Sequence, residues 1–252
     1  MLTNKNYILY SLGIIFVFLL WVVFSSTIGS GNLYFPSPIA TFAKLGEILS
    51  DSYIYISIGW TLLRTLIGFG SALLMAIVLG LLAGSFKSVY TFLKPLMIVF
   101  KSLPTAAVVF IFLALSGSKY APVYIVFLIA FPILYESIVG GIRSVPQDIN
   151  DILRIDTNGG LIPMFKIRVP IASPYIIVGL ASSFALSLKT TIMAEIITGD
   201  TGPGLGNAIR AYRSLDPTDL SPVFAISVIA IVIVLIVDLI GLLINKYIDN
   251  RR

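Results

Sequence analysis

The sequence predicts an all-α polytopic membrane protein with about six transmembrane helices and one short cytoplasmic helix between the fourth and the fifth. Of its 252 residues, 58% are hydrophobic and 12% are charged, whereas soluble domains carry about 25% charged residues. A soluble core of this size could not bury so much apolar surface, so lipid must solvate most of the chain. The apolar residues also gather in runs, and glycine, proline and charged residues separate these runs.

The first apolar run, residues 7–27, is predicted to be a retained anchor helix. Lys5 precedes it as the basic flank of a signal peptide would, but about 20 apolar residues are more than a signal peptide needs. We therefore assign residues 1–30 to an N-terminal anchor. Residues 31–55 are expected to form an external segment. In it, Pro36 and Pro38 interrupt the helical structure, and residues 39–49 form a short amphipathic helix.

The remaining apolar runs give five further spans within a core of residues 56–252. The runs 89–101 and 105–116 are each too short to span alone, and Pro104 separates them, so we interpret 89–116 as one broken span. The five spans are expected at residues 56–82, 89–116, 122–141, 173–197 and 222–247.

The segment between the fifth and sixth spans, residues 198–221, is rich in Gly, Pro and Asp. Its run from Gly199 to Gly206 could suggest a phosphate-binding loop, but it lacks the lysine and the preceding strand. We interpret the run as a re-entrant turn that closes the outer side of a pathway through the membrane.

The distribution of basic residues favours both termini in the cytoplasm. With this orientation nine basic residues lie inside: Lys5, Lys87, Arg143, Arg154, Lys166, Arg168, Lys246, Arg251 and Arg252. Four lie outside: Lys44, Lys119, Arg210 and Arg213. The net charge of +5 therefore needs no nucleic-acid partner to explain it.

Composition also excludes several kinds of site. Cysteine and histidine are absent, so the chain has no disulfide framework, no thiolate metal site and no histidine general base. We predict no catalytic residues and no metal ligands. No stretch fits the nucleotide-binding pattern G-x-x-x-x-G-K-S/T, so any ATP hydrolysis must occur on another chain.

The cytoplasmic loop at residues 143–172 contains a short amphipathic helix. Ser144 and Gln147 form a weak capping box, and Asp148 suits the positive end of a helix. Ile149, Ile152 and Leu153 then fall on one face. This helix could lie on the lipid surface or dock onto a cytoplasmic partner, and periodicity alone favours neither.

Several motifs in order resemble the permeases of binding-protein-dependent ABC importers, in the nitrate/sulfonate/taurine branch. The resemblance runs from Pro36 to Asp238 and rests on Pro36-Ser37-Pro38, Ser102-Leu103-Pro104, Phe131-Pro132-Ile133-Leu134, Val145-Pro146, Asp151-Ile152-Leu153, Phe165, Val169-Pro170, Ser173-Pro174-Tyr175-Ile176, Gly179-Leu180, Ala194-Glu195 and Gly202-Pro203-Gly204-Leu205-Gly206.

The chain departs from the family pattern in its cytoplasmic loop. Asp151-Ile152-Leu153 stands where the family has Glu-Ala-Ala, and Thr157 stands where it has glycine. The glycine pair, Gly159 and Gly160, comes later, so the turn after the helix should differ from that of the family. The pair of Ile152 and Leu153 is bulkier than the two alanines of the family, so it requires a matching groove on the partner. The resemblance implies a coupling helix formed by Asp148, Ile149, Asp151, Ile152, Leu153, Arg154, Thr157, Gly159 and Gly160.

The resemblance also implies the partners and the setting. Two cytoplasmic ATPase subunits would each receive one coupling helix and would hold ATP and Mg²⁺, so this chain itself binds no cofactor. A second copy of the permease would complete the pathway, and an external solute-binding protein would deliver the solute. The protein would be a multi-pass component of a bacterial-type cell membrane, in contact with lipid.

Charged residues inside the spans are candidates for function because an unpaired charge in lipid is costly. Lys189 lies on a polar stripe with Ser183 and Ser187, and such a stripe must face protein or water. We expect the translocation pathway to involve Lys101, Pro104, Ser183, Ser187, Lys189 and Glu195. Glu195 is expected to hold the glycine-rich loop that follows it.

The other charged residues inside the spans are expected to have structural roles. Glu136, Asp238 and Arg64 are expected to reach the interface or to pair with one another, and Lys94 is expected to reach the inner surface. The cations at positions 101 and 189 would favour an anionic solute by Coulomb attraction.

Three classes of function remain open from the residues. The first is the permease of an ATP-driven importer for a small, anionic solute, or for a neutral vitamin or pyrimidine precursor. The second is a stand-alone channel or secondary carrier, which the absence of an internal repeat disfavours. The third is a membrane-embedded enzyme, which the missing histidine, cysteine and acidic cluster disfavour.

Overall fold

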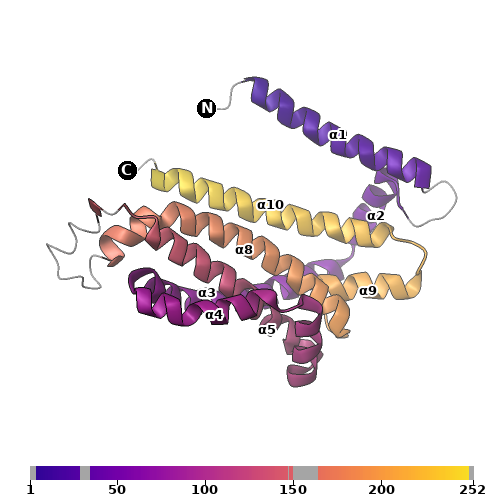
Figure 1. Cartoon of the computed structure of the whole chain (residues 1–252). Coiled ribbons are helices and arrows are strands. Elements are labelled where there is room, and N and C mark those ends of the chain that lie inside the picture. Colours follow the sequence, from indigo (N-terminus) through magenta and orange to yellow (C-terminus); the bar gives the residue numbers. More distant parts are fainter. Residues whose placement is uncertain (1–3, 29–34, 147, 150–163, 250–252) are drawn as a thin grey trace.

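The computed structural model confirms the all-α prediction. It describes residues 4–28, 35–146, 148–149 and 164–249, and within these ranges it contains helices and no strand. The helices are α1 (Asn4–Ile28), α2 (Pro38–Ser50), α3 (Ser52–Ser85), α4 (Lys87–Ser102), α5 (Thr105–Arg143), the π-helix η1 (Met164–Arg168), α8 (Val169–Thr198), α9 (Leu205–Leu215) and α10 (Ser221–Asp249). The long helices α3, α5, α8 and α10 run side by side, and α1 lies apart from them (Figure 1).

Four described segments are long and apolar enough to cross a membrane: Ser52–Ser85, Thr105–Arg143, Lys166–Thr198 and Ser221–Leu243. A shorter apolar segment, Ser11–Thr27, lies in α1. The fifth span begins earlier than expected because η1 leads directly into α8, so that the apolar helical segment starts at Lys166.

The expected broken span at residues 89–116 consists of two helices. The 16-residue helix α4 ends at Ser102, and α5 begins after Pro104, as the proline predicted. A second break occurs inside α5 at Gly117, whose φ of 73° lies in the left-handed region that glycine adopts without strain. The part of α5 before this break points away from the layer of long helices (Figure 1).

Small residues on α3 bring it into close contact with α5. Glycine or alanine recurs at every fourth position on one face of α3: Gly68, Ala72, Ala76, Gly80 and Gly84. A Cβ atom added to Gly68 would lie 2.6 Å from the carbonyl oxygen of Val123, and Cβ atoms at Gly80 and Gly84 would clash with Ile138 and Ile142. Helices in lipid associate through such close backbone approach because burial of apolar surface drives them only weakly.

The register of these contacts shows that α3 and α5 run in parallel. Residue 68 faces residues 123–126, residue 80 faces residue 138, and residue 84 faces residue 142. Two parallel helices need a segment that connects the end of one to the start of the other, and α4 with the first part of α5 provides it. The same face of α5 buries Phe131, Leu134 and Tyr135 in the main apolar cluster.

The helix α8 packs against the other side of α5 in the opposite direction. A Cβ at Gly179 would lie 2.1 Å from the Ser137 hydroxyl, and a Cβ at Gly141 would lie 3.2 Å from Ala172. Because both contacts again involve glycine, α5 is held between two helices at close distance.

At the far end of the bundle, α2, α9 and α10 form a second apolar cluster around Ile48, Leu205 and Ile226. The expected amphipathic helix at residues 39–49 is confirmed as α2, with Ser37 as its N-cap. The helix α9 was not expected: within residues 198–221 only the run from Gly199 to Gly206 was interpreted, as a re-entrant turn. Its apolar face of Leu205, Ala208 and Ile209 carries a helical spacing that would have predicted it.

The N-terminal helix α1 joins the rest of the protein at its C-terminal end. The indole Nε1 of Trp21 donates a hydrogen bond to the Pro36 carbonyl at 3.1 Å, and its ring stacks on Phe224 of α10 at 6.1 Å. Away from this end α1 diverges from α10 (Figure 1), and its apolar side chains are exposed on the subunit.

The close contact of α3 with α5 yields a stability prediction. Gly68→Ala should lower the free energy of unfolding by about 1–3 kcal/mol, because the new methyl group must displace backbone atoms of α5. The measurement is unfolding of the purified protein in mixed micelles with increasing SDS. Gly70→Ala on the same helix is the control, since a Cβ there has nothing within 4 Å; equal losses in both variants would contradict the packing argument.

Candidate functional site

The predicted coupling helix lies mostly outside the described residues. Asp148 and Ile149 are described and helical, with Asp148 exposed. Asp151, Ile152, Leu153, Arg154, Thr157, Gly159 and Gly160 fall outside the described ranges. The assignment of these residues to the coupling helix therefore stays a prediction.

A buried ion pair connects α3 to α8. Arg64 of α3 donates to Glu195 of α8 at 2.8 Å and to Asp200 at 3.1 Å. The side chain of Arg64 is 7% exposed and that of Glu195 is fully buried. We expected Arg64 to reach the interface or to pair with Glu136 or Asp238. This expectation was wrong, because α8 supplies Glu195 and the loop that follows α8 supplies Asp200 as its acidic partners.

Neutral donors complete the shell around the Glu195 carboxylate. The Thr61 hydroxyl lies 2.9 and 3.0 Å from its two oxygens, and the backbone N–H of Gly206 donates to it at 2.9 Å. Thr61 in turn accepts from the N–H of Leu205 at 2.8 Å. A buried carboxylate is stable only when it is paired and hydrogen-bonded in this way.

The glycines of the external loop allow this arrangement. A Cβ at Gly204 would lie 2.8 Å from the Glu195 carboxyl group, and a Cβ at Gly206 would lie 2.3 Å from the Ile192 carbonyl oxygen. The loop therefore lies directly on the end of α8, and Glu195 holds it as expected from the sequence. We did not foresee the parts played by Arg64 and Asp200, because they lie far from Glu195 or beyond the span in sequence.

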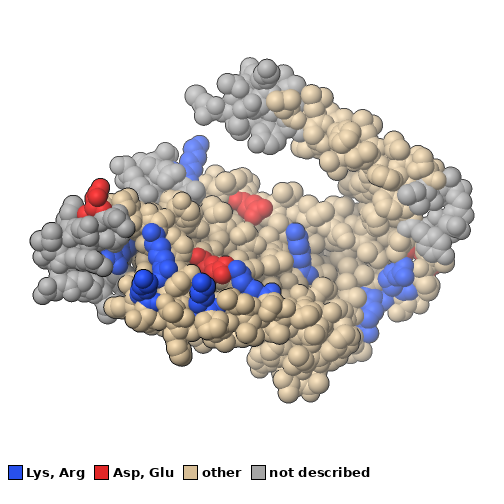
Figure 2. Space-filling model, in the orientation of Figure 1, with Lys and Arg blue, Asp and Glu red and all other residues tan. Residues whose placement is uncertain are grey.

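A second ion pair joins α4 to α5, between Lys101 and Glu136. Both side chains are nearly half exposed on the subunit surface. Lys101 comes three residues before Pro104, which ends the segment between α4 and α5. Figure 2 shows that basic side chains gather over α4 and α8 on one face of the molecule, with few acidic side chains among them.

The polar stripe of α8 divides between two faces. Ser183 and Ser187 are buried within the subunit, and the Ser187 hydroxyl donates to the Ser183 carbonyl oxygen at 2.7 Å. Thr191 on the same face shares a hydrogen bond of 2.8 Å with Thr65 of α3. In this conformation the two serines therefore face neighbouring helices and not an open pathway, whereas Lys189 points to the other side and is exposed.

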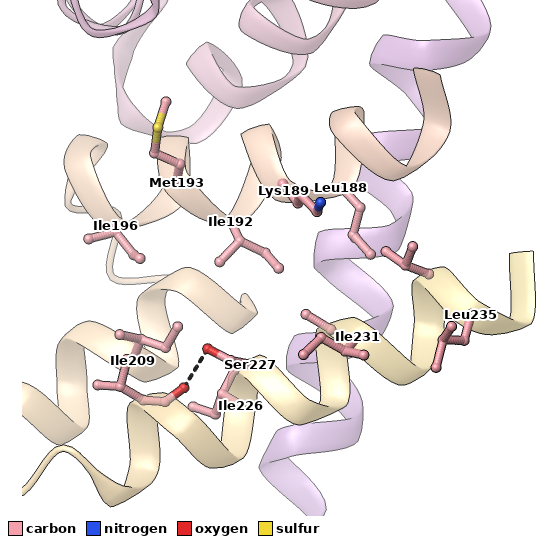
Figure 3. A pocket seen from close by; sticks show the side chains of 13 residues that line it. Leu188, Lys189, Ile192, Met193, Ile196, Ile209, Ile226, Ser227, Ile231 and Leu235 are labelled. Carbon is pink, nitrogen blue, oxygen red and sulfur yellow. Dashed lines mark hydrogen bonds between the residues drawn. The ribbon is translucent and has the colours of Figure 1, made fainter. Parts of the chain in front are cut away.

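Lys189 lines a cavity of about 520 Å³ between α8 and α10 (Figure 3). The 13 lining residues are otherwise aliphatic except for Met193 and Ser227, whose hydroxyl donates to the Val223 carbonyl oxygen. Within the described part of the chain, Lys189 has no ion-pair partner. A cation so placed can attract an anion strongly because the surrounding apolar residues screen its charge little.

Known families and relatives match the chain over most of its length. The profile of the family described as "Binding-protein-dependent transport system inner membrane component" matches residues 76–252. The nitrate import permease protein NrtB of Synechocystis sp. is 30% identical over 240 residues, covering 90% of this chain and 82% of the relative. The bicarbonate transport system permease protein CmpB of Synechococcus elongatus is 27% identical over 250 residues, covering 94% and 84%.

Solved structures share the fold. A chain of the MetNI methionine ABC transporter in inward-facing conformations superposes with a TM-score of 0.68 at 13% identity, covering 78% of this chain and 96% of the other. A chain of an amino acid ABC transporter determined with histidines gives a TM-score of 0.67 at 18% identity, covering 81% and 97%.

The buried pair of Arg64 and Glu195 leads to a second stability prediction. Arg64→Met should cost about 3–5 kcal/mol of unfolding free energy, because it leaves the Glu195 carboxylate buried without its cation. The double variant Arg64→Met with Glu195→Leu should recover part of this loss. SDS-induced unfolding measures both.

The matched control is the surface pair of Lys44, which is partly exposed, and Glu47, which is exposed, 2.8 Å apart. Lys44→Met should change the unfolding free energy by about 0–1 kcal/mol, because surface ion pairs contribute little. A loss for Arg64→Met no larger than that of this control would show that the buried pair does not hold the loop.

Proposed function

The chain belongs to the family of binding-protein-dependent transport system inner membrane components, and from this we propose that it forms the membrane pathway by which a small inorganic anion enters the cell. The protein is the permease subunit of an ABC importer and is not itself an enzyme. Importers of this kind work with an ATPase and an external binding protein.

The unpaired cation on α8 is the observation that carries the proposal of an anionic solute. Lys189 lies within a spanning helix, nine residues before its last residue Thr198, on the subunit surface and beside an apolar cavity. A charged side chain at that depth is costly in lipid, so its face must meet water or another protein surface. The names of the similar permeases, for nitrate and bicarbonate, point to the same class of solute.

Coupling to the ATPase is assigned to the loop between α5 and η1. The ends of α5 and α8 that flank it lie at the same end of the molecule as the start of α1 and the end of α10 (Figure 1). We propose that this end faces the cytoplasm of a bacterial-type cell, with both termini, and that two ATPase subunits dock there and hold ATP and Mg²⁺. A second copy of this chain would complete the pathway at the face that carries Lys189.

The anion proposal predicts a charge-dependent loss of transport. Lys189→Gln should lower ATP-driven nitrate or bicarbonate uptake about tenfold, and Lys189→Arg should retain most of it, because the charge and not the ammonium shape attracts the anion. The assay is uptake of labelled anion into liposomes that contain the complete complex with its binding protein.

Lys119→Gln is the matched control, since Lys119 lies over the Tyr120 ring and away from this cavity. Uptake that persists without ATP would indicate a channel or carrier in place of an importer. Uptake of a neutral solute that nitrate and bicarbonate do not inhibit would overturn the anion assignment.

The coupling proposal predicts loss of the ATPase. Asp151→Lys combined with Leu153→Asp should abolish co-purification of the ATPase encoded beside this chain, together with ATP turnover by the complex, because both changes fall on the docking helix. Lys246→Gln at the end of α10 is the control on the same side of the membrane. Retention of the ATPase by the double variant would mean that the helix is only an interfacial anchor.

A further inference from the structure

Three lysines on α4 recur at intervals of seven residues: Lys87, Lys94 and Lys101. Residues seven apart on an α-helix are rotated by only about 20° from one another, so the three lie along one face. They extend over about 21 Å of helix axis, from the start of α4 to its last turn. The basic side chains over α4 in Figure 2 lie on the same face of the molecule as those over α8.

The face of α4 that carries these lysines is not suited to lipid. All three lysines are exposed on the subunit, while Leu93 and Met97, on the adjoining side of α4, are buried in the main apolar cluster. Charges within a spanning segment face water or protein rather than hydrocarbon. The lysine face of α4 therefore belongs to a wet or protein-covered surface.

A cleft of about 280 Å³ lies between α4 and α5 beneath this face. Lys94 and Tyr90 line it from α4, and Tyr135, Glu136 and Arg143 line it from α5. The Arg143 guanidinium lies 3.7 Å from the centre of the Tyr90 ring and donates one hydrogen bond of 3.1 Å to the Ala83 carbonyl oxygen. Its position is thus fixed, and several of its five N–H donors remain for a ligand.

The hydroxyl of Tyr135 gives an independent sign of a ligand. Tyr135 is 2% exposed, and its hydroxyl has no hydrogen-bond partner among the described residues, although the side chain lines the cleft. A buried hydroxyl without a partner is unfavourable, and proteins leave few of them unsatisfied. An oxygen atom of a bound anion would accept a hydrogen bond from this hydroxyl.

The charge balance of the cleft is positive. Lys94 and Arg143 have no acidic partner in the described part of the chain, and the carboxylate of Glu136 is engaged by Lys101. The cleft therefore presents two free cations and one hydroxyl donor around a small volume. Planar oxyanions match such donors because each oxygen can accept hydrogen bonds from a different direction.

We propose that the cleft between α4 and α5 binds a small oxyanion through Lys94, Arg143 and the hydroxyl of Tyr135. The cleft lies near the loop that joins α3 to α4. The ion pair of Arg64 and Glu195 lies at the other end of the bundle and closes that end. The identity of the anion rests on the proposed function, and nitrate and bicarbonate are its first candidates. The site itself requires only an oxyanion of that size.

The test measures anion binding to the purified complex of permease and ATPase without the binding protein. Sodium nitrate and sodium bicarbonate are titrated while the melting temperature is recorded, with sodium chloride at equal ionic strength in parallel. A ligand that binds the folded state raises the melting temperature with its concentration. We expect an oxyanion-dependent rise that chloride does not reproduce.

Two variants assign the rise to this cleft. Tyr135→Phe should weaken anion binding about tenfold and, without anion, should leave the melting temperature unchanged or raised, because it removes an unsatisfied hydroxyl. Lys94→Gln should weaken binding by a similar factor. Tyr124→Phe, whose ring stacks on Phe112 outside the cleft, and Lys119→Gln are the controls.

The outcomes separate this site from the proposed function. Nitrate uptake by a complex whose melting temperature shows no oxyanion-specific rise would overturn the site and leave the function standing. An oxyanion-specific rise that Tyr135→Phe abolishes, in a complex that transports neither nitrate nor bicarbonate, would support the site and overturn the proposed solute. A rise of equal size in wild type and Tyr135→Phe would overturn the site.

Discussion

The close approach of α5 to both α3 and α8 is the constraint on which the structure depends. In lipid, apolar side chains gain little by leaving the solvent, so helices associate where small residues let their backbones meet. Gly68 and Gly80 provide this contact for α3, and Gly179 provides it for α8. With the three helices fixed in this way, Arg64 comes within reach of Glu195, and Tyr135 is held beneath α4.

The intramembrane charges fall into two groups with opposite physical character. The cluster of Arg64, Glu195 and Asp200 is buried and neutralised by its own members, so it stiffens one end of the bundle and leaves no charge to bind a solute. Lys94 and Lys189 are exposed on the subunit without ion-pair partners in the described ranges. The first group suits a closed structural end, and the second suits a surface that an anion passes.

The sequence predicted the parts of the fold that depend on local pattern. Apolar run length located the long helices, Pro104 marked the break between α4 and α5, and Ser37 with Pro38 marked the start of α2. The second break, at Gly117, and the helix α9 were missed, although the apolar spacing of α9 was visible in the sequence. Helix ends, helix breaks and short amphipathic helices depend on local pattern because each forms within a few residues of chain.

The sequence alone did not predict which side chains of different helices contact one another. Helical spacing placed Ser183 and Ser187 on one face of α8, but it could not say that this face meets neighbouring helices while Lys189 meets the surface. The partner of Arg64 lies 131 residues away, and only the packing of α3 with α8 brings the two together. The cleft that contains Tyr135 depends in the same way on how α4 lies against α5.

The separation of α1 from the other helices has a consequence for biogenesis. The chain is synthesised from its N-terminus, so α1 leaves the ribosome first, whereas Phe224, on which Trp21 stacks, is made more than 200 residues later. Throughout that interval the exposed apolar side chains of α1 need a cover other than α10. The docking of Trp21 onto Phe224 is therefore among the last steps of assembly.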